Sequence, residues 1–426
     1  MNTIPVRFLN DPKYQICILL IALYLFCDFE YKLFIAKYYL STGFEYHFSL
    51  EKNIISKLLM LFSLFYLFVK SSEFIKSVTV VFHATLVIPN LVLFQYMDLP
   101  VAYLFFIFIF IGLLNYSGFY IPIPKSRKIN DKQKSLILVV LALLALLPFL
   151  LTFQVHFNLD FLKMGGELYD VRREAGAISN VVTRYLFSPL FKIILPLVIV
   201  YGLRESKFLV SGIGVACIFL LFFMLPHKSV FFAAFVVLFF YFTASYLKKT
   251  RTFLVLFVAL LFFTKFLHLF AGNILPESIF YRRFLMLPAF LNILYFEQFV
   301  DAPIYFSHSI FKSFIDYPHT LQPSNLIGLT YGGNPLTNAN NGFLSDGFMN
   351  LGYFGMALFT LFVTLIFKFF DALKIPPQYF GIFFLIIGVF NSAAFFTSLL
   401  THGLILFIII AYFFLNNSKQ QLPNKE

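Results

Sequence analysis

Tryptophan, cysteine and charge are the scarce components of this sequence. It contains no tryptophan, 3 cysteines and 12% charged residues, against 60% hydrophobic residues in a chain of 426. Soluble globular domains carry about 25% charged residues, so a water-soluble protein is excluded. The cysteines Cys17, Cys27 and Cys217 all lie in apolar runs and show neither metal-ligand spacing nor the pattern of a disulfide framework.

Several catalytic motifs are also missing. The sequence has no Asp-x-Asp pair, no His-Glu-x-x-His, no Cys-x-x-Cys and no Walker-type phosphate loop. Metal-dependent glycosyl transfer, zinc chemistry and ATP hydrolysis therefore have no support in the sequence. We predict no metal site and no cofactor.

Long apolar runs dominate what is present. A hydrocarbon core needs about 17 to 25 apolar residues per crossing helix. Twelve runs approach that length, with the first and last the weakest, and the sequence predicts an all-α integral membrane protein with about 12 transmembrane helices. The predicted spans are 15–36, 54–70, 78–96, 100–123, 136–154, 185–203, 208–225, 229–247, 253–272, 347–369, 378–397 and 403–416.

The basic residues predict the orientation of these spans. With a cytoplasmic N-terminus, 18 of the 32 lysines and arginines fall in short inner segments, with 125–128 and 248–251 as the clearest clusters. We expect both termini to be cytoplasmic and the first span to be a retained anchor. The net charge of +12 then reflects topology, so no nucleic-acid partner is predicted.

The same topology gives two long outer loops, 155–184 and 273–346, on a single polytopic domain covering residues 1–426. The inner connections are all short, so function is expected on the outer face. The first loop holds a dense charge cluster that includes Asp170, Arg172, Arg173 and Glu174. These charges either pair with one another in solvent or offer guanidinium groups that bind a pyrophosphate bidentately.

The second long loop contains a pair of adjacent arginines, Arg282 and Arg283. Residues 279–299 around them are largely apolar and fit an amphipathic helix on the outer leaflet. The pair either touches lipid phosphate or takes part in a site.

Three lysines are notable near the outer ends of spans. Lys192 and Lys265 lie within spans, where either snorkelling or lining a cavity explains them. Lys228 sits in a tight outer turn and is expected to face a cavity.

Residues 334–355 form a polar, asparagine- and glycine-rich approach to the tenth predicted span. This composition suits backbone folded back toward the membrane, where amides and Asp346 line a wet cavity. Asn341 is followed by Gly352 and Gly355, a glycine spacing that also serves helix packing.

This stretch resembles the region before a late span in the bacterial O-antigen polymerase (Wzy-like) and O-antigen ligase superfamily. That family carries a polar residue or histidine followed about ten positions on by Gly-x-x-Gly, which Asn341, Gly352 and Gly355 match. Asn341 stands where ligases place histidine, which favours the polymerase branch, and Gly342 departs from the residue often found next. Residues 169–172 are similar to an arginine motif of oligosaccharide repeat unit polymerases, whereas the arginine-x10-glycine pattern of some polymerases is absent.

The resemblance implies a GT-C-like fold in the bacterial inner membrane and a glycosyltransferase activity. The substrate would be a polyprenyl-pyrophosphate-linked oligosaccharide, and the growing glycan would pass to the next lipid-linked unit on the outer face. Arg172, Arg173, Arg282, Arg283 and Lys228 would hold the pyrophosphate. Asp346 and Arg172 are the catalytic candidates, and Asp170, Glu174 and His308 follow on the acceptor side.

Other readings stay open. An O-antigen ligase uses the same donor chemistry with another acceptor. A flippase has less need of two long outer loops, so the loops favour an enzyme. A secondary transporter is expected to have paired broken helices, which are not obvious in this sequence. The sugars, the linkage and a chain-length-regulating partner cannot be read from the sequence. Membrane lipids are the remaining expected partner.

Overall fold

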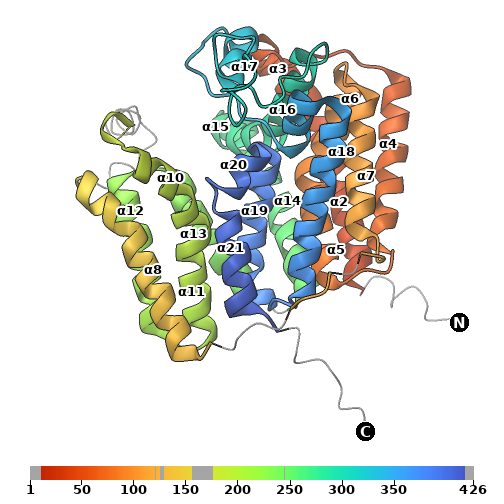
Figure 1. Cartoon of the computed structure of the whole chain (residues 1–426). Coiled ribbons are helices and arrows are strands. Elements are labelled where there is room, and N and C mark those ends of the chain that lie inside the picture. Colours follow the sequence, from red (N-terminus) through yellow and green to blue (C-terminus); the bar gives the residue numbers. More distant parts are fainter. Residues whose placement is uncertain (1–10, 120, 125–128, 156–175, 244, 418–426) are drawn as a thin grey trace, which may run out of the picture. The chain divides into compact units, whose positions relative to one another are not determined.

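Every regular element in the described part of the chain is a helix. The computed structural model describes residues 11–119, 121–124, 129–155, 176–243 and 245–417. Each of the twelve predicted spans coincides largely with helix (Figure 1). Six helices are long and apolar enough to cross a membrane: Glu73–Tyr96, Asp131–Thr152, Val181–Arg204, Tyr246–Ala271, Leu275–Gln298 and Phe343–Ala372. The all-α class predicted from the sequence is thus confirmed, and these six helices have the length and apolar composition of membrane spans.

The chain packs as two compact units. Unit 1 comprises 1–120, 246–368 and 387–395, and unit 2 comprises 121–245, 369–386 and 396–426. Two packing units can belong to one domain, so the expected single domain stays a prediction. The helices of unit 1 are α2 (Pro12–Glu30), η1 (Tyr31–Ile35), α3 (Ala36–Tyr38), η2 (Leu40–Thr42), α4 (Leu50–Leu64), η3 (Phe65–Leu67), α5 (Glu73–Phe82), η4 (His83–Val87), α6 (Ile88–Tyr96), α7 (Val101–Asn115), α14 (Tyr246–Ala271), α15 (Leu275–Glu277), η7 (Ser278–Met286), α16 (Leu287–Gln298), α17 (Pro323–Gly332) and most of α18 (Phe343–Ala372).

In unit 1, α14 packs on α2 and α5, α4 packs on α6, and α5 packs on α7. The segment 301–342 with α17 lies at one end of this bundle, which we call the α17 end (Figure 1). The second long loop predicted from the sequence therefore contains ordered helix, including a continuous stretch from α15 through η7 to α16.

Unit 2 is built from α8 (Asp131–Thr152), α10 (Val181–Pro189), η6 (Leu190–Ile194), α11 (Leu195–Arg204), α12 (Phe208–Met224), α13 (Lys228–Tyr241), η8 (Pro377–Tyr379), the first half of α19 (Phe380–Ser392), most of α20 (Phe395–Leu399), α21 (Leu404–Ile410) and η9 (Ala411–Leu415). α11 and α8 both pack on α12. The Ser211 hydroxyl donates to the Ile199 carbonyl oxygen at 3.0 Å, which joins α12 to α11. Small polar residues of this kind bring membrane helices close together.

Side-chain caps mark where many helices begin. Asp11, Ser49, Ser72, Asn130 and Asn180 each accept a backbone N–H from the first turn of the helix that follows. Such caps satisfy donors that a helix leaves without partners. They place the polar ends of α2, α4, α5, α8 and α10 outside the apolar stretches.

Three of the prolines inside long helices each lie just after a wider π-helical turn. Pro89 follows η4, Pro196 follows η6 and Pro288 follows η7. Proline lacks the N–H that an α-helix needs, and π-turns are a way to accommodate such interruptions without ending the helix. The apolar runs therefore continue through their prolines.

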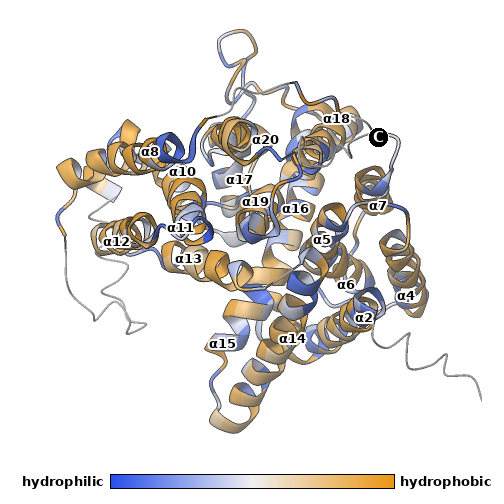
Figure 2. Cartoon of the chain, turned by 90° about the horizontal axis from the view of Figure 1, so that it is seen from below, coloured by the Kyte–Doolittle hydropathy of each residue, from blue (hydrophilic) through white to orange (hydrophobic). Residues whose placement is uncertain are grey.

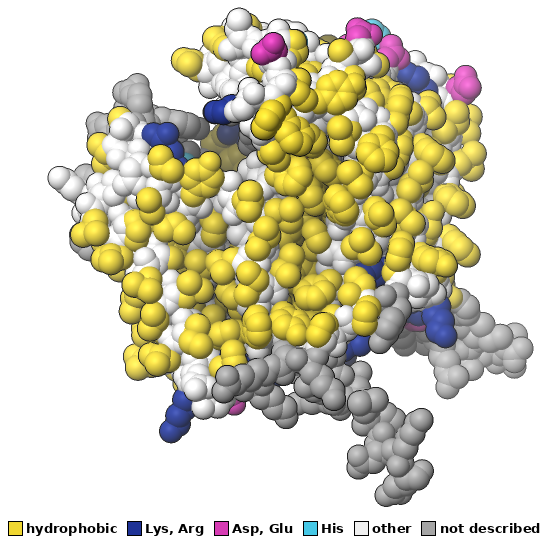
Figure 3. Space-filling view, viewed as in Figure 1, with side chains coloured by type: hydrophobic (Ala, Val, Ile, Leu, Met, Phe, Trp, Pro, Cys, Tyr) yellow, Lys and Arg dark blue, Asp and Glu magenta, His cyan; other side chains and the backbone are white. Residues whose placement is uncertain are grey.

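Apolar side chains cover the sides of the helices. In the most apolar stretch of α8 and of α14 only 28% of the residues are buried, whereas 94% are buried in that of α5–α6. Figure 2 shows hydrophobic colour over α4, α8 and α14, and Figure 3 shows apolar side chains over α7 and α18. A helix that is apolar on its exposed face is suited to lipid.

Candidate functional site

The polar segment singled out in the sequence is buried where the chain turns into α18: residues 341 and 342 precede the helix, and residues 343–350 are its first turns. All ten residues of 341–350 are buried. Asp346, which is 3% exposed, accepts from the Asn350 side-chain amide at 3.0 Å, from the Asn341 amide at 3.4 Å and from the Phe395 backbone N–H at 2.8 Å. Both carboxylate oxygens thus have partners inside the protein.

Side chains of α16 support this turn with a second set of hydrogen bonds. The Asn292 side-chain oxygen accepts the Gly342 N–H at 2.5 Å and also the Ser345 hydroxyl, while its amide donates to the Asn391 carbonyl oxygen at 3.2 Å. Tyr295, one turn on, donates its hydroxyl to the Ala339 carbonyl oxygen at 2.6 Å. These bonds hold backbone that is not helical against a buried helix face, as polar backbone at membrane depth requires.

The α18 helix is broken directly after the turn. Gly352 has φ +60° and ψ −147°, a backbone conformation that only glycine adopts readily. The carbonyl oxygens of Met349 and Asn350 leave the helical pattern and accept the N–H groups of Ile304 and Tyr305 at 2.9 and 3.0 Å. The segment that carries His308 is thereby fastened to the break.

Gly355 allows close packing on the other side of the break. A Cβ built on Gly355 would meet the carbonyl oxygen of Gly347, and one built on Gly347 would meet the Gly355 carbonyl oxygen at 2.5 Å. The glycines of the sequence motif therefore have separate structural reasons: Gly352 for its dihedral angles, Gly355 for contact with backbone.

The turn brings Asn341 and Asp346 into contact and places Gly352 and Gly355 beside them. With its oxygens occupied, Asp346 is placed to hold the turn, and its expected role as a base stays a prediction. Asp170, Arg172, Arg173 and Glu174 lie outside the described residues. Lys228 is the exposed first residue of α13 in unit 2 and does not belong to this turn.

Arg282 and Arg283 lie in η7, about ten residues before Asn292, which corresponds to about 15 Å along a helix. The Arg282 guanidinium lies 4.2 Å from the centre of the Tyr39 ring and donates to the Ser278 hydroxyl at 3.2 Å. Arg283 is exposed. Only one guanidinium of the pair is thus held by protein contacts, while the other is open to an anion.

His308 is half-buried near the ring of Tyr317, and its Nδ1 atom has no hydrogen-bond partner. Burial lowers the pKa of its imidazole below the ordinary value, because the charged form is desolvated. The unfolded segment therefore takes up a proton before the folded one as the pH falls, so the stability contributed by neutral His308 is lost on acidification.

We expect hydrogen–deuterium exchange of segment 301–322, corrected for the intrinsic rate, to become faster between about pH 7.5 and about pH 5. The His308→Gln variant should lose most of this pH dependence, whereas His47→Gln, on an exposed stretch of unit 1, should keep it. An unchanged dependence in His308→Gln would contradict the assignment.

Unit 2 contains a basic cluster that the sequence did not bring together. His402, in the turn before α21, contacts Ser188 and lies 3.3 Å from the Lys192 ammonium. The ammonium also lies 5.4 Å from the Phe191 ring, and among the described residues no carboxylate forms an ion pair with it. Lys192 was expected to snorkel or to line a cavity, which stays a prediction; its described partner is a histidine 210 positions away along the chain.

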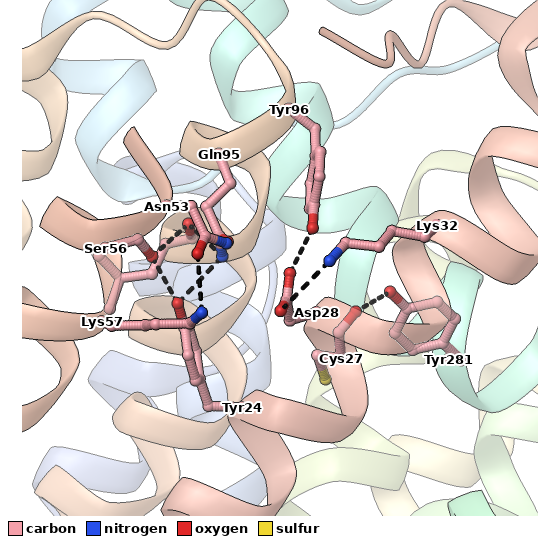
Figure 4. A network of polar contacts seen from close by, with 11 residues as sticks. Tyr24, Cys27, Asp28, Lys32, Asn53, Ser56, Lys57, Gln95, Tyr96 and Tyr281 are labelled. Carbon is pink, nitrogen blue, oxygen red and sulfur yellow. Dashed lines mark hydrogen bonds and ion pairs between the residues drawn. The ribbon is translucent and has the colours of Figure 1, made fainter. Parts of the chain in front are cut away.

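A network of polar side chains joins α2, α4 and α6 (Figure 4). The Tyr24 hydroxyl lies 2.8 Å from that of Ser56 and accepts from the Gln95 amide at 3.0 Å, while Tyr96 donates to Asp28. Its members largely satisfy one another, which is typical of polar groups that hold membrane helices together.

The chain also carries a buried ionic cluster of Glu30, Lys265, Glu277 and His268 at the α17 end of unit 1. Among these only Lys265 stood out in the sequence. The spacing of Lys265 and His268, which places both on one face of α14, could have pointed to the histidine, but no local spacing points to the two glutamates.

An apolar groove of about 680 Å³ runs between α4, α6 and α7, with Ile55, Phe94, Leu104 and Tyr116 in its lining. Across the described residues no group of three or more histidine, cysteine or acidic side chains could hold a metal ion. This finding does not test the prediction, made from the sequence, that the protein has no metal site.

No protein-family model, no curated protein and no solved structure matches the chain.

Proposed function

We propose that the chain is a polymerase of lipid-linked oligosaccharide repeat units in the bacterial inner membrane. It would cross the membrane twelve times, with both termini in the cytoplasm and the α17 end of unit 1 at the outer face. The observation that carries this proposal is the buried polar turn of residues 341–350 followed by the helix break at Gly352. The resemblance to the polymerase family rests on the same residues.

The chemistry is glycosyl transfer with a polyprenyl pyrophosphate leaving group. A hydroxyl of the next lipid-linked unit attacks the anomeric carbon, the bond to the pyrophosphate oxygen breaks, and the hydroxyl proton leaves to a base. Positive charge is needed where the leaving group gains negative charge. Exposed Arg283 supports that role in unit 1, as do Arg172 and Arg173 in the sequence.

In unit 2 the Lys192 and His402 pair, with Lys228 at the start of α13, offers further charge for an anionic group. The apolar groove between α4 and α7 suits an isoprenoid chain, because its lining is almost wholly hydrocarbon. Arginine can supply the charge that a metal ion supplies elsewhere, so the reaction needs no metal. A GT-C-like arrangement belongs to this proposal.

A second candidate is a transporter of lipid-linked oligosaccharide. The observation that favours it is the buried ionic cluster of α2, α14 and α15, since ionisable groups within membrane helices commonly mark ion or proton pathways. If the protein is a transporter, the polar turn has no catalytic role.

The deciding experiment is the length distribution of surface glycan in a strain that lacks the chain, with the wild-type chain restored as control. A glycan of single repeat units supports the polymerase, because export and attachment then proceed without extension. Polymerised but unattached glycan would identify a ligase, and repeat units retained on the cytoplasmic side of the membrane would identify the transporter.

A further inference from the structure

Four ionisable side chains form a continuous buried chain at the α17 end of unit 1. The Lys265 ammonium lies 2.8 Å from a Glu30 oxygen and 3.7 Å from a Glu277 oxygen. The other Glu277 oxygen lies 2.5 Å from His268 Nδ1, and His268 Nε2 lies 3.3 Å from the Tyr38 hydroxyl. Glu30 and Glu277 are 1% and 0% exposed, so solvent reaches neither carboxyl group.

The charges of this cluster do not balance. Two carboxylates face one ammonium, which leaves one net negative charge if the imidazole is neutral. An uncompensated buried charge is strongly destabilising, and groups in that position change protonation state instead. One more positive charge is needed for a neutral cluster.

Two oxygen atoms show where that charge belongs. One oxygen of Glu30 and one of Glu277 are buried without any hydrogen-bond partner, and both carboxyl groups lie against the Lys265 ammonium. We propose that Glu30 and Glu277 share one exchangeable proton, so that the cluster is a proton-binding site opening toward the α17 end. A proton between the two oxygens gives both a partner and brings the net charge to zero.

A metal cation fits less well. The ammonium of Lys265 already occupies the position between the carboxylates, so a sodium ion there would meet a like charge. Within the described ranges no group of three or more histidine, cysteine or acidic side chains could hold a metal ion, and that includes this cluster. The proton needs no added volume and no further ligand.

Polar groups around the cluster offer the proton a route from the carboxyl pair to the surface. Elements packed on the cluster contribute Cys27 from α2, Tyr281 from η7, and Lys37 and Tyr38 from α3. The Tyr281 hydroxyl donates to the Cys27 carbonyl oxygen at 2.7 Å and so does not continue the route. Tyr38 contacts His268 and is followed by the turn of residues 40–43. His268 and Tyr38 therefore connect the carboxyl pair with the surface at the α17 end.

The test is infrared spectroscopy of the full-length protein in lipid nanodiscs at neutral pH. We expect a carboxylic-acid C=O band that shifts when glutamate is labelled with ¹³C and that loses the area of one carboxylic acid in Glu30→Gln or Glu277→Gln. Asp28→Asn serves as the matched control on α2, because Asp28 belongs to the neighbouring network with Tyr96 and should leave the band unchanged.

The labelled wild-type protein keeps the proposal testable even where a variant does not fold. The proposal would be overturned by a C=O band that does not shift when glutamate is labelled. A band that keeps its full area in both folded glutamine variants would overturn it as well. Tyr38→Phe tests the route: we expect the band to persist while its shift on transfer to D₂O slows at least several-fold. Unchanged exchange would overturn the route through Tyr38.

Discussion

Replacement of Asp346 by alanine is expected to abolish glycan polymerisation and to lower the stability of unit 1. The substitution removes the acceptor of three buried donors, the Phe395 N–H and the amides of Asn341 and Asn350. Each buried donor left without a partner costs about 1–3 kcal/mol. Thermal unfolding in detergent and the glycan length in a complemented deletion strain measure the two effects.

A conservative variant separates positioning from catalysis at Asp346. Asp346→Asn keeps an oxygen for the Phe395 N–H but has no carboxylate to accept a proton. If Asp346 holds the turn, this folded variant should retain measurable polymerisation. A folded but wholly inactive Asp346→Asn would instead show that the carboxylate acts on the substrate. Asp301→Ala, at an exposed acid of the same end of unit 1, is the control expected to behave as wild type.

The second large effect is expected at the helix break. Gly352→Ala forces a side chain into a conformation at φ +60° and ψ −147° that costs of order 1–3 kcal/mol. Gly355→Ala drives a methyl group into the Gly347 carbonyl oxygen, where backbone on both sides has to move. We expect both variants to lose thermal stability and polymerisation.

Gly388→Ala is the matched control for these variants. It lies in α19, is exposed, and a Cβ there meets nothing within 4 Å. Alanine in a helix interior is more favourable than glycine by roughly 0.5–1 kcal/mol, so stability should stay the same or rise. If Gly352→Ala matched Gly388→Ala in both measurements, the break at residue 352 would not be needed for folding or function.

The helical fold follows from the sequence because apolar runs of membrane-crossing length leave helix as the way to satisfy backbone groups in lipid. Polar runs were also informative: the stretch around Asn341 and Asp346 is buried, although residues 343–350 are helix, and the expectation of backbone folded back toward the membrane stays a prediction. The expected wet cavity around Asp346 is not what the structure shows, since that carboxylate is surrounded by protein donors.

Partners that are distant along the chain could not be predicted. Lys265 pairs with Glu30 across 235 positions, and Lys192 meets His402 across 210. No local periodicity links such residues, because their proximity depends on how the helices pack. Residues 279–299 were expected to form an amphipathic helix on the membrane surface, and the helix Leu275–Gln298 that holds most of them is long and apolar enough to be a candidate span as well.

The ion pair between Glu30 and Lys265 constrains how the chain enters the membrane. α14, which carries the partner of Glu30, follows α2 by more than two hundred residues. Charged residues at a helix centre cost about 2.5–3.5 kcal/mol on insertion scales, and Glu30 at the end of α2 avoids the full penalty only while it stays near the interface or neutral. Until α14 is made, Glu30 has no Lys265 with which to pair, so we expect the final packing of α2 to wait for the middle of the chain.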